Sequence, residues 1–133
     1  MAVTTVAKTR KDQMKAVSEA YFAGLASRDV SKVPWAENVV FRGPLAPGGL
    51  DVPLRGRKAV VGWFTTLYPV LGKTKVIEHY FNDDLTVIAT RADVGIITPP
   101  CALRVVDRFT INDRGQITEQ ENHYDPRPAL QKA

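Results

Sequence analysis

A single acidic residue on an apolar strand face is the first feature of this sequence that could do chemistry. Residues 103–111 alternate between apolar and polar side chains, as a strand with one buried face does. The apolar positions include one carboxylate, Asp107. A buried carboxylate without partners costs several kcal/mol, so it pairs with a cation or has a raised pKa. Asp107 is therefore either an acid, a base or a donor near neutral pH, or a structural residue paired with a neighbour.

A phenol, Tyr21, is the second such group, and it falls on the apolar stripe of a predicted helix. Over residues 10–28 apolar side chains recur at steps of three and four, which is typical of an amphipathic helix. The stripe also holds Met14, Val17 and Leu25. A phenol in such a stripe commonly packs in the core while its hydroxyl reaches the edge.

Further elements must position these two residues. Asp29 is expected to cap a second short helix that carries Val33 and Trp35. A short strand over residues 39–41 precedes a loop over residues 43–53, where three prolines and three glycines oppose regular structure.

The second half of the chain predicts one helix followed by a run of strands. The helix covers residues 56–71 and ends at Gly72. A turn at Asn112 to Gly115 separates the last two strands, because Asn, Asp and Gly tolerate left-handed geometry. The predicted strands are residues 75–81, 85–97, 102–111 and 116–124.

This order of elements predicts an α+β fold with the helices on one face of a curved, mostly antiparallel sheet. Such a sheet leaves a cavity at its mouth, where small ligands bind. We expect one domain over residues 10–128, a flexible arm over residues 1–9 and a tail over residues 129–133.

Composition limits the classes of binding partner, cofactor and cellular location that we expect for this protein. The net charge of +4 comes from scattered basic residues, which argues against a nucleic-acid surface. No apolar stretch approaches the roughly 20 residues of a membrane span. With one cysteine, Cys101, and no secretory signal, a cytoplasmic location is expected. Neither His79 nor His123 pairs with a second ligand at metal-site spacing, and no glycine-rich phosphate loop follows a strand, so no metal or organic cofactor is expected.

Several stretches resemble the ketosteroid isomerase and SnoaL-like proteins of the nuclear-transport-factor-like superfamily. The stretches are Tyr21–Asp29, Ala36–Phe41, Val105–Phe109, Asn112–Gly115 and Ile117–Asp125. The resemblance implies a cone-shaped α+β barrel whose sheet encloses an apolar pocket. The aromatic residues expected to line the pocket are Trp35, Phe41, Trp63, Phe64 and Phe109.

The resemblance also implies roles for individual residues. In ketosteroid isomerases, a tyrosine and a protonated aspartic acid form an oxyanion hole, and Tyr21 and Asp107 match those positions. The isomerase's catalytic base precedes a proline on the first strand, and that place is Gly43, before Pro44. The chain therefore lacks the usual base.

A partial resemblance to limonene epoxide hydrolase-like enzymes suggests a second reaction. Those enzymes use an Arg-x-Asp on a middle strand, which Arg91 and Asp93 match. Their last-strand carboxylate falls at Asn122, and their water-holding residues fall at Phe41 and Gly43. Arg91 and Asp93 are alternatively an ordinary ion pair on one strand face.

SnoaL-like cyclases share this scaffold, and the alignment with them places Gln120, Asn122 and Tyr124 in the cavity and His123 on the outer face. The leading hypothesis is cofactor-free proton transfer of the isomerase, cyclase or lyase type on an apolar carbonyl compound, with Asp107 as acid or base and Tyr21 as donor. The alternatives are epoxide hydrolysis at Arg91 and Asp93, or a module that binds a small ligand without turnover.

The resemblance further implies a homodimer through the outer face of the sheet. The apolar residues expected on that face are Ile77, Phe81, Ile88 and Val94.

Overall fold

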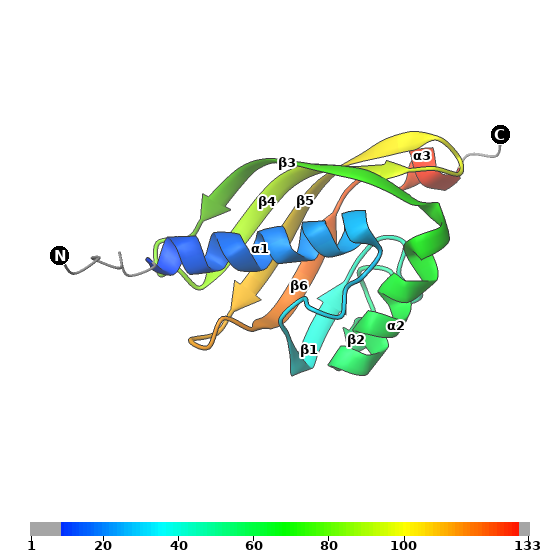
Figure 1. Cartoon of the computed structure of the whole chain (residues 1–133). Coiled ribbons are helices and arrows are strands. Elements are labelled where there is room, and N and C mark those ends of the chain that lie inside the picture. Colours follow the sequence, from blue (N-terminus) through cyan, green and yellow to red (C-terminus); the bar gives the residue numbers. More distant parts are fainter. Residues whose placement is uncertain (1–8, 131–133) are drawn as a thin grey trace.

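The structure, a computed structural model, describes residues 9–130 as one strongly curved sheet with helices on its concave side (Figure 1). Helix α1 crosses the concave face, and α2 lies beside β1 and β2 at one end of the sheet. The helices are α1 Arg10–Ser27, α2 Arg57–Leu67, the 3₁₀ turn η1 Tyr68–Val70 and α3 Arg127–Leu130. The strands are β1 Trp35–Arg42, β2 Leu54–Arg55, β3 Leu71–Phe81, β4 Val87–Ile96, β5 Cys101–Ile111 and β6 Ile117–His123.

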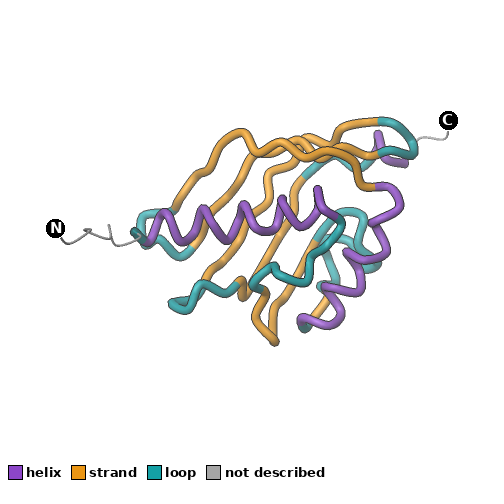
Figure 2. The backbone as a smooth tube through the Cα atoms, viewed as in Figure 1, coloured by secondary structure: helices purple, strands orange, loops and turns teal. Residues whose placement is uncertain are grey.

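The six strands form one mixed sheet in the order β2-β1-β6-β5-β4-β3. Strands β3 to β6 form an antiparallel meander, and β1 pairs with β6 in the one parallel ladder among the described strands. The sheet curls without closing, and Figure 2 shows it as a continuous layer around α1. The predicted α+β class and curved sheet are confirmed.

Helix α1 forms where the spacing predicted it and has a defined cap at each end. Oγ1 of Thr9 accepts a hydrogen bond from the backbone N–H of Asp12 at 3.1 Å, which satisfies one of the free donors of the first turn. Arg28 ends the helix in the left-handed conformation, with φ of 56°. The inward face includes Met14, Ser18 and Tyr21, so the phenol is held by a regular helix.

The second short helix expected after Asp29 is absent. Residues 29–34 form turns, and Trp35 is instead the first residue of β1. Oδ1 of Asp29 does accept from the Ser31 backbone N–H at 3.0 Å, but this bond closes a local turn. Pro34 disfavours the helical conformation at Val33, so the turn leads into a strand.

The predicted helix over residues 56–71 is too long at its C-terminal end. Helix α2 stops at Leu67, η1 follows, and β3 already begins at Leu71. Pro69 explains the early stop, because proline has no N–H to donate to the preceding turn. Gly72, predicted to end the helix, lies inside β3.

The turn between β5 and β6 is built as its residue types predict. Oδ1 of Asn112 accepts from the backbone N–H groups of Arg114 at 3.0 Å and Gln116 at 2.9 Å. Gly115 adopts φ of +74°, the left-handed region that glycine enters without steric cost. This turn, together with a register shift between Thr110 and Ile111, brings Asp107 opposite Asn122.

The alternation along β5 also places side chains as expected: Val105, Asp107 and Phe109 are buried, and Arg104 and Arg108 are exposed. The apolar residues predicted for the outer face are mostly misplaced. Phe81, Ile88 and Val94 belong to the inner core or pack against it, and Ile77 alone of the four is exposed. Within residues 9–130 no helix is long and apolar enough to cross a membrane.

Candidate functional site

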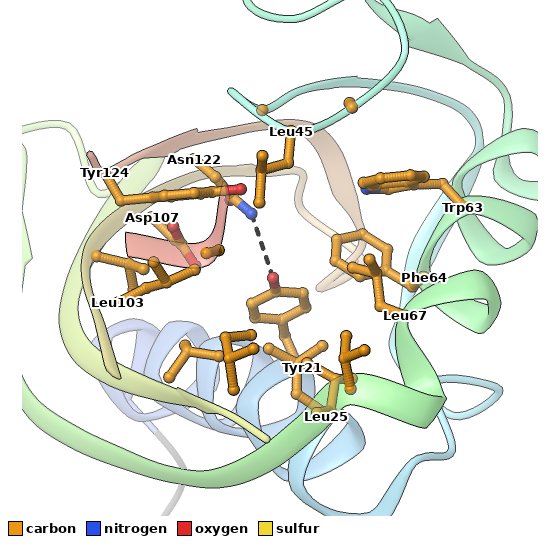
Figure 3. A pocket seen from close by; sticks show the side chains of 18 of the residues that line it. Tyr21, Leu25, Leu45, Trp63, Phe64, Leu67, Leu103, Asp107, Asn122 and Tyr124 are labelled. Atoms are coloured by element: carbon orange, nitrogen blue, oxygen red, sulfur yellow. Dashed lines mark hydrogen bonds between the residues drawn. The ribbon is translucent and has the colours of Figure 1, made fainter. Parts of the chain in front are cut away.

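A cavity of about 250 Å³ lies between α1, α2 and the inner face of the sheet. Figure 3 shows Tyr21 entering from the side of α1 while Asp107, Asn122 and Tyr124 face it from the sheet. Most of the lining is apolar, as is typical of small-molecule sites. The lining residues that carry the chemistry or the shape of the site are Tyr21, Phe41, Trp63, Asp107, Asn122 and Tyr124.

Asp107 projects from the middle of β5 into this cavity and is 1% exposed. Among the described residues, its Oδ1 atom has no hydrogen-bond partner, and no basic side chain forms an ion pair with it. Burial therefore raises the pKa of Asp107 well above its ordinary value. The neutral acid is favoured over a wider pH range, in which it can donate a hydrogen bond or a proton.

Tyr21 faces the cavity from α1 and is almost completely buried. Its ring makes edge contacts with Trp35, Phe64 and Phe109, at centroid distances of 6.2, 5.5 and 5.4 Å. Burial and the neighbouring Asp107 carboxyl raise the pKa of Tyr21 well above its ordinary value, and the hydrogen bond from Asn122 opposes this shift. The phenol thus keeps its proton and can serve as a donor.

A chain of buried hydrogen bonds ends on the Tyr21 hydroxyl. Nε1 of Trp35 donates to Oε1 of Gln120 at 2.8 Å, and Nε2 of Gln120 donates to Oδ1 of Asn122 at 3.0 Å. Nδ2 of Asn122 then donates to the Tyr21 hydroxyl at 3.2 Å, drawn as the dashed line in Figure 3. Asn122 lines the cavity, whereas Trp35 and Gln120 lie one layer behind it.

Of the aromatic residues expected at the pocket, Phe41, Trp63 and Phe64 line the cavity, while Trp35 and Phe109 lie behind the lining residues. Trp35 stacks on Phe64 with the ring centroids 5.3 Å apart. Alternation along a strand predicts which face a side chain occupies, but not whether it reaches the cavity or stops in the layer behind.

Tyr124, just beyond β6, lines the cavity beside Asp107, as Figure 3 shows. Burial and the Asp107 carboxyl raise the pKa of Tyr124 to about 12. Tyr124 is therefore a second neutral phenol that lines the cavity.

Gly43, which the resemblance places at the position of the isomerase base, has little space for a side chain. Gly43 lines the cavity, and a Cβ atom there would lie 2.9 Å from Cζ of Phe41. Phe41 is buried and packs against Phe64 with the centroids 5.1 Å apart, so it cannot move aside freely. Of the carboxylates among the described residues, only Asp107 lines the cavity.

The structure does not bring Arg91 and Asp93 into the cavity. They form an ion pair at 2.9 Å on the outer face of β4, because Ala92 and Val94 take the alternate, inward positions. Neither residue lines the cavity. The expectation that they form a hydrolytic site in the pocket is wrong in its geometry, and the ordinary ion pair is what the structure contains.

Both histidines have structural settings. His79 lies between Thr90, with Nδ1 and Oγ1 2.8 Å apart, and Glu19, with Nε2 and Oε2 2.9 Å apart. His123 is exposed on the outer face, 3.0 Å from Glu121. Among the described residues, no three His, Cys, Asp or Glu side chains are grouped as a metal site requires.

Sequence reasoning missed cavity residues that come from loops and from the C-terminal segment. Leu45 and Ala46 belong to the loop assigned as breaker-rich, and Ala129 belongs to α3, where a tail was expected to begin. The only signal for the loop residues was two apolar side chains between prolines. The predicted arm falls mainly on residues 1–8, which lie outside the described residues, as do residues 131–133.

Comparison with known proteins agrees with this fold. Residues 18–120 match the model of the SnoaL-like domain, so the chain belongs to the SnoaL-like domain family. No match was found among curated protein sequences.

Solved structures show the same fold at low sequence identity. A steroid delta-isomerase from Pseudomonas aeruginosa has 20% identity and a TM-score of 0.70, over 97% of this chain and 88% of that one. The epoxide hydrolase/cyclase-like enzyme SalBIII, of pyran ring formation in the polyether salinomycin, has 17% identity and a TM-score of 0.70, over 88% and 95%. A SnoaL-like protein of unknown function from Burkholderia thailandensis has 13% identity and a TM-score of 0.71, over 89% and 98%.

Proposed function

We propose that this protein is an enzyme that transfers a proton to or from an apolar, carbonyl-bearing small molecule without a cofactor. One observation carries the proposal: Asp107 faces an apolar cavity with its Oδ1 atom unpaired. A buried carboxyl without a partner is costly to the fold, and groups of this kind cluster at functional sites.

The two polar groups divide the chemistry between them. The Tyr21 hydroxyl donates a hydrogen bond to the carbonyl oxygen, where negative charge develops when a proton leaves the adjacent carbon. In its ionised form, Asp107 takes that proton, and the C–H electron pair moves into the enolate. Its raised pKa makes the carboxylate a stronger base. Return of the same proton to another carbon gives an isomer and restores Asp107.

The relatives support this class of reaction without naming the substrate. One similar structure is a steroid delta-isomerase and another is an epoxide hydrolase/cyclase-like enzyme, so the fold accommodates both isomerisation and cyclisation. The site at Asp107 favours proton transfer over hydrolysis at Arg91 and Asp93, because that ion pair lies on the outer face.

A panel of enones, polyketide-like ketones and epoxides, assayed with the parent and four variants, tests the proposal. Tyr21→Phe should lower kcat on an enone or ketone by on the order of 10²-fold or more, as loss of one oxyanion donor does. Asp107→Asn should lower it by on the order of 10²-fold or more, as loss of a general base does. Asp93→Asn is the matched carboxyl control and Tyr80→Phe the matched phenol control, since both lie outside the cavity.

Two results would overturn the proposal. Loss of epoxide opening in Asp93→Asn, with Tyr21→Phe active, would assign hydrolysis to the outer ion pair. Tight binding of panel compounds by the parent without turnover of any of them would make the protein a ligand-binding module.

We also propose that the chain forms a homodimer through the outer face of the sheet and acts in the cytoplasm. Ile77, Tyr80 and Val106 are exposed on β3 and β5, and apolar surface of this kind favours a partner. Light scattering at micromolar concentration should give twice the 14.7 kDa of one chain. Val106→Glu should shift the mass to one chain, whereas Val52→Glu, on an exposed loop, should not. A monomeric parent would contradict the dimer.

A further inference from the structure

The hydrogen-bond chain behind the cavity has a direction that its first member sets. An indole N–H can only donate, so Trp35 requires the oxygen of Gln120 at its end of that side chain. The amide nitrogen of Gln120 then faces Asn122 and requires its oxygen, which leaves the Asn122 nitrogen to face Tyr21. Each amide orientation therefore follows from the one before it, starting from a group that cannot reverse.

Burial prevents solvent from breaking or reversing this chain. Trp35 and Tyr21 are each 2% exposed, Gln120 is completely buried and Asn122 is 5% exposed. Trp35 is held by its stack on Phe64, with 16° between the ring planes. Reversing Gln120 would place its NH2 group against the Trp35 N–H and its oxygen against Oδ1 of Asn122. Reversing Asn122 alone would place two NH2 groups against each other, and such unpaired contacts are strongly unfavourable in a buried setting.

We infer that Trp35, Gln120 and Asn122 are positioning residues that commit the Tyr21 hydroxyl to act as a donor toward the cavity. The hydroxyl oxygen accepts from Asn122, so its own proton is left for a bound ligand. The head group that Tyr21 recognises is therefore an acceptor such as a carbonyl oxygen. A role for these residues in turnover rests on the proposed function. The direction of the hydrogen-bond chain does not depend on the proposed function.

Gln120→Glu is the variant that reverses the chain at constant shape. An ionised glutamate can accept from Trp35, but its second oxygen cannot donate to Asn122. Burial favours the protonated form, which could still donate, so binding is measured at a pH above the pKa of the introduced glutamate. Asn122 then turns its nitrogen toward position 120 and its oxygen toward Tyr21, so the phenol donates to Asn122 and presents an acceptor to the cavity. Gln13→Glu, on the outer side of α1, is the control for the same chemical change outside the chain.

Binding of two matched probes measures the reversal. Acetylnaphthalene carries a carbonyl acceptor, and naphthylethanol, its reduced form, carries a hydroxyl that can also donate. In Gln120→Glu, the ratio of the ketone Kd to the alcohol Kd should rise about tenfold or more over the parent, because the ketone then faces an unpaired acceptor. Gln13→Glu should leave the ratio unchanged. A ratio that stays the same in Gln120→Glu would overturn the inference.

A second measurement needs neither a ligand nor a folded variant. In NMR spectra of the parent, the side-chain amide protons of Asn122 should show contacts to the Tyr21 ring, and the Trp35 indole proton should lie near the Gln120 side chain. Asn122 amide protons that contact Gln120 in place of Tyr21 would overturn the inference. Because neither experiment requires turnover, an inert protein with this chain direction would contradict only the proposed function.

Discussion

Two polar clusters lie side by side on the concave face of the sheet, and they differ in whether their hydrogen bonds are filled. In the first, Thr90 is completely buried between Ser18, with the hydroxyl oxygens 2.6 Å apart, and His79, at 2.8 Å. Glu19 completes the cluster at the surface, 2.9 Å from His79. Each of these groups has a partner, so the cluster joins α1 to β3 and β4.

The second cluster begins directly across the ladder, because Asp107 pairs in register with Thr90. Here the Asp107 carboxyl faces the cavity with its Oδ1 atom unpaired, and the Tyr21 hydroxyl has accepted a bond while its proton remains available. Thr90 and Asp107 are thus neighbours on one buried face, but the hydrogen bonds of Thr90 are filled and those of Asp107 are not. Between these two clusters, it is unfilled hydrogen-bonding capacity, and not burial of a polar residue as such, that distinguishes the candidate site from the structural cluster.

Breaking the filled cluster should cause the largest loss of stability. Thr90→Val leaves both Ser18 and His79 without their buried partner and should lower the free energy of unfolding by about 1–3 kcal/mol. Urea unfolding followed by circular dichroism measures this loss. Thr118→Val, at a half-buried threonine with one long bond of 3.4 Å, is the control and should change stability little. A loss no larger than that of the control would show that the filled cluster is not structural.

The unfilled cluster should make the free energy of unfolding depend on pH. Burial raises the folded-state pKa of Asp107, so between the unfolded value of about 3.9 and the folded value the folded protein binds more protons. The contribution of Asp107 to stability is therefore fully present below about pH 3.9 and is lost as the pH rises through the folded pKa.

Asp107→Asn removes this dependence, so the variant should gain stability relative to the parent as the pH rises, by up to about 1.4 kcal/mol per pH unit in that window. Urea unfolding of both proteins from about pH 5 to about pH 8 measures the difference. Asp113→Asn, in the exposed turn after β5, is the control for the same substitution away from the cavity. A constant difference between parent and Asp107→Asn would mean that the carboxyl is solvated.

The smallest effect is expected at the outer ion pair, which belongs to neither cluster. Arg91 and Asp93 have side chains that are 20% and 38% exposed, and partly solvated pairs contribute less than about 1 kcal/mol. Asp93→Asn should therefore change the urea midpoint slightly. A loss as large as that of Thr90→Val would place the outer pair among the structural clusters.

Much of this arrangement could be predicted from local patterns. The spacing of Met14, Val17 and Tyr21 fixes the inward face of α1, and the alternation around Asp107 fixes the inward face of β5. The Asn112 turn fixes the last hairpin. These features depend on residues close in sequence, so their physical causes are visible without the fold.

The remaining errors concern relations between distant segments. The outward placement of Phe81 and Ile88 failed because β3 contains a register shift after Val76, and because the inner face holds more apolar residues than the strand pattern suggested. The depth of Trp35 behind the cavity depends on its stack with Phe64 of α2, which no local pattern specifies. Arg91 and Asp93 matched a motif, but Ala92 and Val94 take the inward positions of β4, although Val94 was expected on the outer face.

The tight contact between Gly43 and Phe41 has a consequence for how this protein could acquire a new activity. Adding an acidic side chain at position 43 alone would force it against the Phe41 ring, only 2.9 Å from the first added carbon. Shrinking Phe41 alone would enlarge the cavity that it lines and remove its packing on Phe64, at a cost of up to about 3–5 kcal/mol for truncation to alanine. Each single step is therefore disfavoured, and the two substitutions are expected to be epistatic. Introducing an isomerase-type base at position 43 would therefore require substitutions at both Gly43 and Phe41.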